Sequence, residues 1–291
     1  MSPSSAGIAS FEGARYSRAD SRGVGMSWGP FDLTGKTVIV TGSAMGIGFG
    51  IASRCREAGA NVFIADIDAD AAAAAVTRLK AVSGGGAVAS AQADISSSKS
   101  AEDVVATCAR ELGAVHVLVN NAGIYPIMPL ADVNPDIVDR IMRVNVHGVL
   151  YMTKAFAAQV ERQGGGGAVV NIASMDAFHP SFVGLSTYGA SKGAVVAMTK
   201  HHALELAPLR IRVNAIAPGA IMTEGAAKTS EGGGLSEEER QALGDAMTAR
   251  IPVGRMGEPD DIAKVAVFLA SSAADYVTGQ TIISDGGILL S

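Results

Sequence analysis

Cysteine is scarce in this chain of 291 residues, which contains only Cys55 and Cys108. Both lie in segments with a helical pattern, and two isolated thiols do not make the framework of a disulfide-rich fold or a cysteine-rich metal site. Sparse cysteine is typical of proteins kept in a reducing compartment. We therefore expect a cytoplasmic protein with neither a disulfide nor a bound metal.

Long apolar runs and long basic runs are also missing. No uninterrupted apolar stretch approaches the roughly 18 residues of a membrane-spanning helix. The formal net charge is −5 and the basic residues do not cluster, so the sequence lacks the electrostatic footprint of a nucleic-acid-binding protein. Residues 1–30 lack the apolar core of a secretory signal, and we interpret them as an irregular extension outside the fold. The expected partner is a small molecule, not a membrane or a nucleic acid.

What the chain does contain is a repeated alternation of short apolar runs and helical patterns. Such alternation predicts an α/β fold, in which residues 31–291 form a single domain with a doubly wound, seven-stranded parallel sheet flanked by helices. Ligands of such sheets bind beyond the carboxyl ends of the strands. The pattern breaks at about 220–252, which we expect to form a mobile substrate lid. The predicted strands are 36–40, 61–65, 87–93, 115–119, 168–172, 211–216 and 281–284.

A glycine-rich turn, Thr41–Gly48, follows the first predicted strand and precedes a helical pattern. This is the context of a dinucleotide-binding turn, although the spacing is G-x-x-x-G-x-G. Gly42 lets the chain turn sharply, and glycines at 46 and 48 let a pyrophosphate approach the helix N-terminus. Asp66 ends the second strand about 20 residues further on, where a carboxylate binds the adenosine ribose and repels a 2′-phosphate. The pattern therefore favours NAD over NADP.

Tyr188 and Lys192 are four residues apart, so in a helix they lie on one face. A tyrosine has a pKa of about 10, and a nearby ammonium group lowers that pKa. The pair is thus a candidate acid/base unit, although this spacing is common by chance in exposed helices. Ser174 follows the fifth predicted strand and could supply a hydroxyl. Asn145 lies in an apolar stretch of a predicted helix at 135–161, either as a kinking core residue or as a site residue.

Residues 31–287 resemble the short-chain dehydrogenase/reductase family. The resemblance rests on T-G-x-x-x-G-I-G, N-N-A-G at Asn120–Gly123, Pro218-Gly219 and the four residues just described. It implies a Rossmann-type fold, a nicotinamide cofactor and a homodimer or homotetramer. It also implies a catalytic tetrad of Asn145, Ser174, Tyr188 and Lys192. The interval from Ser174 to Tyr188 is one residue longer than is usual in the family, so Ser181 and Ser186 are competitors of Ser174.

The predicted function is that of an oxidoreductase that transfers a hydride between NAD(H) and a secondary alcohol or ketone, neutral and fairly hydrophobic. One alternative, an NADPH-dependent 3-oxoacyl-carrier-protein reductase, is disfavoured by Asp66 and the acidic balance. Another, a catalytically silent NAD(H)-binding protein, is disfavoured because all four tetrad positions are present. An apolar substrate pocket would involve Tyr125, Met175, Phe178 and Phe182, which could equally be core residues. The predicted cofactor-binding residues are Gly42, Ser43, Met45, Gly46, Ile47, Gly48, Asp66, Ile67, Asp94, Ile95, Asn121, Ala122, Gly123, Tyr188, Lys192, Pro218, Gly219, Ile221 and Thr223.

Overall fold

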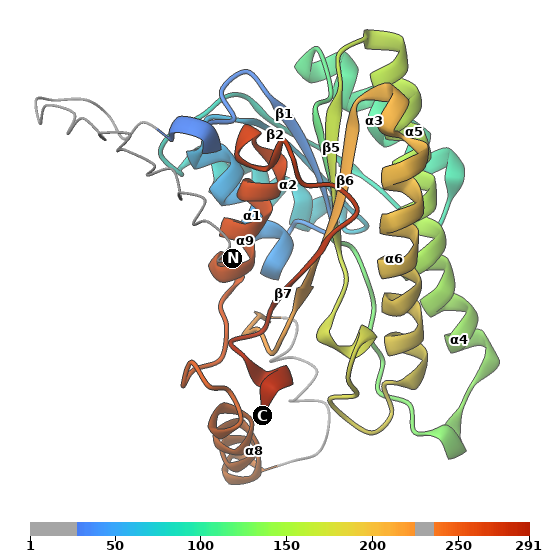
Figure 1. The fold of residues 1–291 in the computed structure, drawn as a ribbon, viewed down its shortest axis with the longest axis vertical. Helices are drawn as coiled ribbons and strands as arrows, with labels where there is room; N and C mark the ends of the chain where they lie inside the picture. Colours follow the sequence, from blue (N-terminus) through green and yellow to red (C-terminus); the bar gives the residue numbers. More distant parts are fainter. Residues whose placement is uncertain (1–27, 225–235) are drawn as a thin grey trace, which may run out of the picture.

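The computed structural model describes residues 28–224 and 236–291. Within these residues the strands form one parallel sheet of seven, in the order β3-β2-β1-β4-β5-β6-β7 (Figure 1). The predicted α/β fold is thereby confirmed. The strands are β1 (Thr37–Thr41), β2 (Asn61–Asp66), β3 (Val88–Gln92), β4 (Val117–Asn120), β5 (Gly167–Ile172), β6 (Ile211–Pro218) and β7 (Thr281–Ser284).

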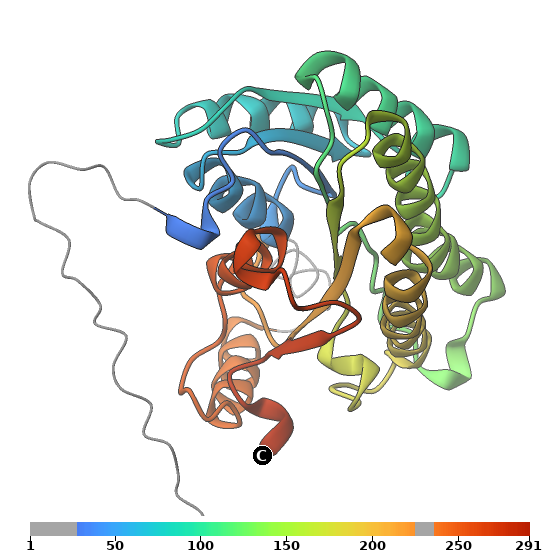
Figure 2. The same cartoon turned by 45° about the horizontal axis from the view of Figure 1, so that its top comes forward.

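Helices cover both faces of this sheet (Figures 1 and 2). Helices α1 (Gly46–Glu57), α2 (Ala69–Lys80) and α9 (Pro259–Ala270) lie on one face. The other face carries α3 (Ser98–Leu112), α4 (Pro135–Met142), α5 (Gly148–Gln163) and α6 (Ser186–Glu205). Helix α8 (Glu237–Ala249) lies beyond the carboxyl ends of the strands, near the C-terminus (Figure 1). None of the helices in 28–224 and 236–291 is long and apolar enough to cross a bilayer.

The alternation of side chains along β1 explains this two-faced core. All five residues of the T-V-I-V-T run are buried. Val38 and Val40 pack in the cluster that contains α1, α2 and α9, whereas Ile39 packs in the cluster with α3 and α5. Successive side chains of a strand point to opposite faces, so a continuous apolar run suits a strand covered on both sides. The same property made β1 recognisable in the sequence.

The helix predicted at 135–161 differs from the structure in its middle. Helix α4 ends at Met142, a π-helical turn occupies Arg143–His147, and α5 then continues to Gln163. Asn145 lies inside this turn and is fully buried. Its side chain bonds both backbone groups of Ile124, in the connection after β4. A π-helical turn inserts a residue into a helix, and such turns are frequent at functional sites.

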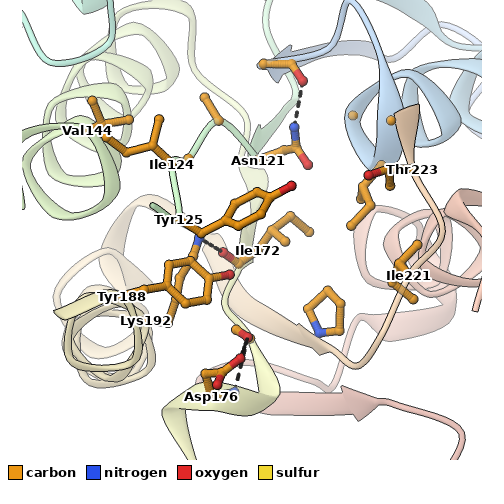
Figure 3. Close-up of a pocket in the computed structure, with 18 of the residues that line it drawn as sticks. Asn121, Ile124, Tyr125, Val144, Ile172, Asp176, Tyr188, Lys192, Ile221 and Thr223 are labelled. Atoms are coloured by element: carbon orange, nitrogen blue, oxygen red, sulfur yellow. Dashed lines mark hydrogen bonds between the residues drawn. The ribbon is translucent and has the colours of Figure 1, made fainter. Parts of the chain in front are cut away.

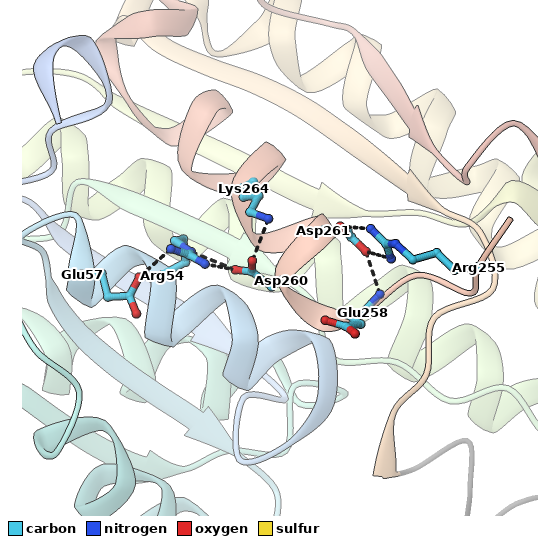
Figure 4. A network of polar contacts seen from close by, with 7 residues as sticks. All are labelled: Arg54, Glu57, Arg255, Glu258, Asp260, Asp261 and Lys264. Carbon is cyan, nitrogen blue, oxygen red and sulfur yellow. Dashed lines mark hydrogen bonds and ion pairs between the residues drawn. The ribbon is translucent and has the colours of Figure 1, made fainter. Parts of the chain in front are cut away.

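Two ion-pair groups fix the segment that returns from β6 to α9 (Figure 4). The Arg54 Nε of α1 donates to Asp260 at 2.8 Å, which joins α1 to α9. Arg255 donates to both carboxylate oxygens of Asp261, at 2.7 and 2.9 Å. Nearby, Ile221 forms an isolated parallel bridge with Gly257. These contacts hold the chain at the start of the predicted lid and just after its end. Residues 225–235 of the predicted lid and most of the predicted N-terminal extension lie outside the described ranges.

Candidate active site

A cavity of about 1380 Å³ runs along the carboxyl ends of the strands (Figure 3). Most of its wall is built from residues that follow β1 through β6, and α4 and α8 also contribute to it. We call the part around Gly42–Gly48 and Asp66 the glycine end, and the part around Ser174, Tyr188 and Lys192 the tyrosine end. Ligand pockets commonly measure about 300–1,000 Å³. This cavity is therefore large enough for an extended ligand such as a dinucleotide together with a smaller molecule.

The glycine end is packed so closely that side chains are excluded. Gly42 has a φ of +59°, and a Cβ there would lie 2.7 Å from the Cα of Ala122. A Cβ on Gly48 would overlap the Gly42 carbonyl oxygen and the Asn121 side chain. That Asn121 amide donates to the carbonyls of Thr41 and Gly42, both at 2.8 Å, and so ties the turn to the residues after β4. Backbone atoms therefore form the wall of the cavity at Gly42 and Gly48, while Met45 and Ile67 line it beside them.

The first turn of α1 is open to the cavity. Its N-cap residue, Met45, makes no side-chain capping bond, so the turn lacks the usual side-chain acceptor for its N–H groups. Unpaired N–H groups and the helix dipole attract anions at such a terminus. A pyrophosphate therefore fits the space that the glycines leave. Ser43 differs from the prediction, because its buried hydroxyl donates to the Val40 carbonyl at 2.6 Å and does not line the cavity.

Asp66 lies at the rim of the glycine end, at the last position of β2. The backbone N–H of Ala44 donates to its Oδ2 at 2.9 Å, and that of Asp68 to its Oδ1 at 3.2 Å. The neighbouring lining residues, Met45, Ile67 and Asp68, carry no positive charge. The carboxylate is thus held by backbone donors, with no cationic side chain among these neighbours.

The tyrosine end brings together three residues of the predicted tetrad. Ser174 lies just beyond β5, while Tyr188 and Lys192 lie one turn apart on α6, and all three line the cavity. The Lys192 Nζ donates to the Ile172 carbonyl at 2.8 Å (Figure 3). Of the competing serines, Ser181 also lines the cavity, whereas Ser186 does not. The Ser174 hydroxyl interacts with Tyr188 and acts to lower its pKa.

Asn145 lies behind this wall and does not line the cavity. Its Oδ1 accepts from the Ile124 N–H, and its Nδ2 donates to the Ile124 carbonyl, both at 2.9 Å. The same Nδ2 donates at 3.0 Å to the Ser191 hydroxyl, which in turn donates to the Tyr188 carbonyl at 2.7 Å. Asn145 therefore links the connection after β4 to the helix that carries Tyr188 and Lys192.

Burial shifts the pKa values of both α6 residues. It raises the pKa of Tyr188 to about 12, with Ser174 opposing this effect and Asp176 adding to it. Burial lowers the pKa of Lys192 to about 8. The expected lowering of the tyrosine pKa by Lys192 is not seen in the chain alone. The reason is that the ammonium group lies 5.8 Å from the Tyr188 ring centre and donates to Ile172 instead.

The predicted substrate residues divide into two groups. Tyr125, Met175 and Phe182 line the cavity, and the Tyr125 ring lies 5.9 Å from that of Tyr188. Phe178 is 49% exposed and is not among the lining residues, so its contact with substrate stays a prediction.

Sequence reasoning missed Asp176, which lies two residues after Ser174 and lines the tyrosine end. The Ser174 hydroxyl donates to its Oδ2 at 3.2 Å. The S-x-D spacing at the end of a strand was the available signal. Further lining residues that were missed include Ile127, Leu185, Met256 and the charged residues Asp136, Asp139, Arg140 and Arg143.

Comparisons with known proteins agree with this geometry. A family model described as enoyl-(acyl carrier protein) reductase matches residues 42–289. The (S)-acetoin-forming diacetyl reductase of Staphylococcus epidermidis is 37% identical over 257 residues, which cover 87% of this chain and 98% of that protein. The L-rhamnose 1-dehydrogenase (NAD(P)(+)) of Azotobacter vinelandii is 36% identical over 261 residues, 89% of this chain and 98% of that one.

A solved structure is similar over nearly the whole domain. The crystal structure of a short-chain type dehydrogenase/reductase from Mycobacterium marinum has a TM-score of 0.82 and 33% sequence identity, covering 90% of this chain and 98% of that one. The chain belongs to the short-chain dehydrogenase/reductase family of oxidoreductases.

Proposed function

We propose that the chain transfers a hydride between NAD(H) and a secondary alcohol or its ketone, with Tyr188 as the acid/base group. The observation that carries this proposal is the shared cavity. The glycine turn and Asp66 stand at one end, and Ser174, Tyr188 and Lys192 at the other. When bound, the nicotinamide ring supplies or accepts the hydride. The chain's own residues bind that cofactor, orient the alcohol and move the proton.

The proton chemistry follows from the two shifted pKa values. With a pKa of about 12, Tyr188 is protonated at neutral pH and can donate to a ketone oxygen. In the reverse direction the phenolate form accepts the proton of the alcohol, and general acid–base help of this kind is worth roughly 10²–10⁴-fold in rate. Lys192 has a pKa of about 8, so it is mostly an ammonium ion at pH 7 and can offset the negative charge of the phenolate.

Ser174 and Asn145 would act differently. The Ser174 hydroxyl donates to Asp176 in this structure, so it must turn to donate to the substrate oxygen. Asn145, by resemblance, supports a water that relays protons to Lys192. Its side-chain bonds to Ile124 and Ser191 also hold the backbone around the site. We assign Asn145 to proton relay and positioning, and the other three residues to contact with substrate or cofactor.

The preference for NAD over NADP is part of the proposal. Asp66 fits the two ribose hydroxyls as an acceptor, and within the described residues no lining side chain beside it could neutralise a 2′-phosphate. The relatives leave this choice open, since the name of the rhamnose dehydrogenase covers both cofactors.

Diacetyl and L-rhamnose are uncharged, which agrees with a neutral substrate. We also propose that the chain assembles as a dimer or tetramer in the cytoplasm, and that residues at about 220–252 form a lid over the substrate.

The decisive experiment measures NADH formation from a panel of secondary alcohols, with NAD and NADP in parallel. Tyr188→Phe removes the acid/base group and should lower kcat by roughly 10²–10⁴-fold, with the NADH dissociation constant unchanged. Tyr276→Phe is the matched control, because Tyr276 is fully exposed on the surface. Wild-type turnover by Tyr188→Phe would reject the assigned role. Tight NADH binding without turnover of any alcohol or ketone would favour the silent binding protein, and a preference for NADP would favour the carrier-protein reductase.

A further inference from the structure

The turn after β5 brings a carboxylate to the tyrosine end. Asp176 belongs to the single 3₁₀ turn Met175–Ala177 and lines the cavity with Ser174 and Tyr188 (Figure 3). Its negative charge contributes to the raised pKa of Tyr188, so the carboxylate lies within electrostatic reach of the phenol. In the parts of the chain that the structure describes, no lysine or arginine forms an ion pair with Asp176.

The two oxygens of this carboxylate have different partners. Oδ1 accepts from the Ser181 backbone N–H at 3.0 Å and from the Ser181 hydroxyl at 2.7 Å, which holds the loop. Within 28–224 and 236–291, Oδ2 accepts only the Ser174 hydroxyl, at 3.2 Å. A serine hydroxyl has one proton to donate. When Ser174 turns to the substrate oxygen, Oδ2 therefore loses its donor.

The substrate itself can replace that donor. Asp176 Oδ2 and the substrate oxygen are alternative acceptors of one hydroxyl, so each lies within about 3 Å of its oxygen and the two lie no more than about 6 Å apart. In a gauche arrangement, a hydroxyl on the neighbouring carbon lies about 3 Å from the reacting oxygen and can span the remaining gap with one hydrogen bond. A carboxylate oxygen without a donor in a partly buried site is unfavourable, even though Oδ1 keeps its two bonds from Ser181. A substrate that supplies this second hydroxyl is therefore favoured.

We propose that Asp176 is a specificity-determining residue that accepts a hydrogen bond from a hydroxyl on the carbon next to the reacting one. Vicinal diols and α-hydroxyketones are then the preferred substrates, a refinement that rests on the proposed hydride transfer. In the oxidation of a diol, a bound NAD⁺ would accept the carbinol hydride, and the phenolate form of Tyr188 would accept the hydroxyl proton. The second hydroxyl and the Asp176 carboxylate are unchanged, and the products are an α-hydroxyketone and NADH.

The test compares butane-2,3-diol, 3-methoxybutan-2-ol and butan-2-ol as substrates with NAD. The methyl ether keeps the second oxygen but cannot donate a hydrogen bond. Because the second hydroxyl of the diol can donate a hydrogen bond to the charged carboxylate, kcat/KM for the diol should exceed that for the ether by roughly tenfold to a hundredfold. Asp176→Ala should abolish this ratio, and Asp176→Asn, which retains a neutral acceptor, should reduce it in part. Asp139→Asn is the control for charge alone, because Asp139 is exposed on α4 at the rim of the same cavity and should leave the ratio unchanged.

Each outcome separates the inference from the function on which it rests. The role of Asp176 would be overturned if the diol-to-ether ratio of kcat/KM were the same in the wild type and in Asp176→Ala. It would also be overturned if Asp176→Ala lowered kcat/KM by the same factor for all three substrates, because damage to the loop alone has that effect. If all three alcohols are oxidised equally and Tyr188→Phe stops the reaction, hydride transfer stands and the preference for a second hydroxyl is rejected. The preference is also rejected if the diol is not oxidised while another alcohol reacts.

Discussion

The two ends of the cavity are built in different ways. At the glycine end the wall at Gly42 and Gly48 is backbone, held so closely that a Cβ on Gly42 would lie 2.7 Å from a neighbouring Cα. At the tyrosine end, beyond the α6 pair, the wall includes side chains on connections, such as Tyr125, which is 39% exposed, and Phe182, which is 43% exposed. Backbone walls accept few changes, whereas exposed side chains can be exchanged at small cost. This difference suits a site in which one ligand is constant and the other is variable.

The largest effect is expected from filling the glycine end. In Gly48→Ala the new methyl would overlap the Gly42 carbonyl oxygen, so the turn must shift. Overpacking of this kind costs about 2–3 kcal/mol of unfolding free energy. A displaced turn should also lower the efficiency with NAD by roughly a hundredfold. Calorimetric titration with NADH and thermal unfolding measure the two effects.

Gly193→Ala is the matched control. Gly193 lies in α6, and a Cβ there would meet nothing within 4 Å. Alanine in a helix interior is better than glycine by roughly 0.5–1 kcal/mol, so this variant should be slightly more stable. If both alanine variants bind NADH as the wild type does, the glycine end is less constrained than we describe.

A second test concerns Lys192, at the boundary between the two ends. Its pKa falls from 10.5 to about 8 on folding, so between these pH values the unfolded chain binds a proton that the folded chain does not. The contribution of Lys192 to the free energy of unfolding therefore rises with pH across this window, by about 3 kcal/mol for a shift of this size. Lys192→Met should remove this rise. Urea unfolding at several pH values between about 7.5 and 10, a range that spans most of the interval between the folded and unfolded pKa values of Lys192, measures it.

The control here is Lys200→Met, on the exposed side of the same helix. It should retain the full pH dependence. Cys55 and Cys108 act in the opposite sense from about pH 9, because burial raises the pKa of each thiol from 9.0 to about 12. The comparison between the wild type and Lys192→Met cancels these two contributions. Measurements stop near pH 10 because Tyr188 also acts in the opposite sense above it. Its pKa is raised from 10.0 to about 12, so the unfolded chain loses the phenolic proton first and stability falls with pH between these values. A slope in Lys192→Met equal to that of the wild type would mean that Lys192 is not desolvated.

Asp66→Asn should produce a smaller, more selective change. The amide oxygen can still accept from the Ala44 N–H, but the charge that repels a 2′-phosphate is gone. The ratio of kcat/KM with NADP to that with NAD should rise about tenfold, which corresponds to about 1.4 kcal/mol. Asp70→Asn, exposed in the first turn of α2, should leave the ratio as it is. An unchanged ratio in Asp66→Asn would count against NAD preference.

The smallest effect is expected at the edge of the tyrosine end. Phe182→Leu trims a lining ring that is 43% exposed, and should change the KM for the alcohol by about threefold without altering NADH affinity. Phe178→Leu makes the same change at a ring that is 49% exposed but outside the cavity. Equal KM values in the two variants would show that the cavity rim does not contact the substrate.

This contrast also explains what could be predicted from the sequence. The strands were recognisable because each carries its own apolar run, and the glycine turn because Gly42 and Gly48 are required by their immediate surroundings. The same holds for Asp66, whose position follows from the end of β2. Local sequence determines such features, so local reasoning finds them.

Other features depend on contacts between distant segments. The π-helical turn is stabilised by Asn145 bonds to Ile124, 21 residues earlier in the chain. Which of Phe178 and Phe182 reaches the cavity depends on the path of one loop. The pKa of Tyr188 depends on how deeply the folded chain buries it. A pattern of residue types contains none of this information, which is why these three expectations needed correction or refinement.

The strand order has a consequence for how the sheet is built during synthesis. In the order β3-β2-β1-β4-β5-β6-β7, β2 and β3 add successively on one side of β1, and β4 to β7 add successively on the other. Each strand that leaves the ribosome therefore meets a free edge, and none has to be inserted between two strands that are already paired. Because non-local strand pairing is slow and leaves edges exposed to aggregation, growth by edge addition lets the nascent sheet form without undoing earlier pairings.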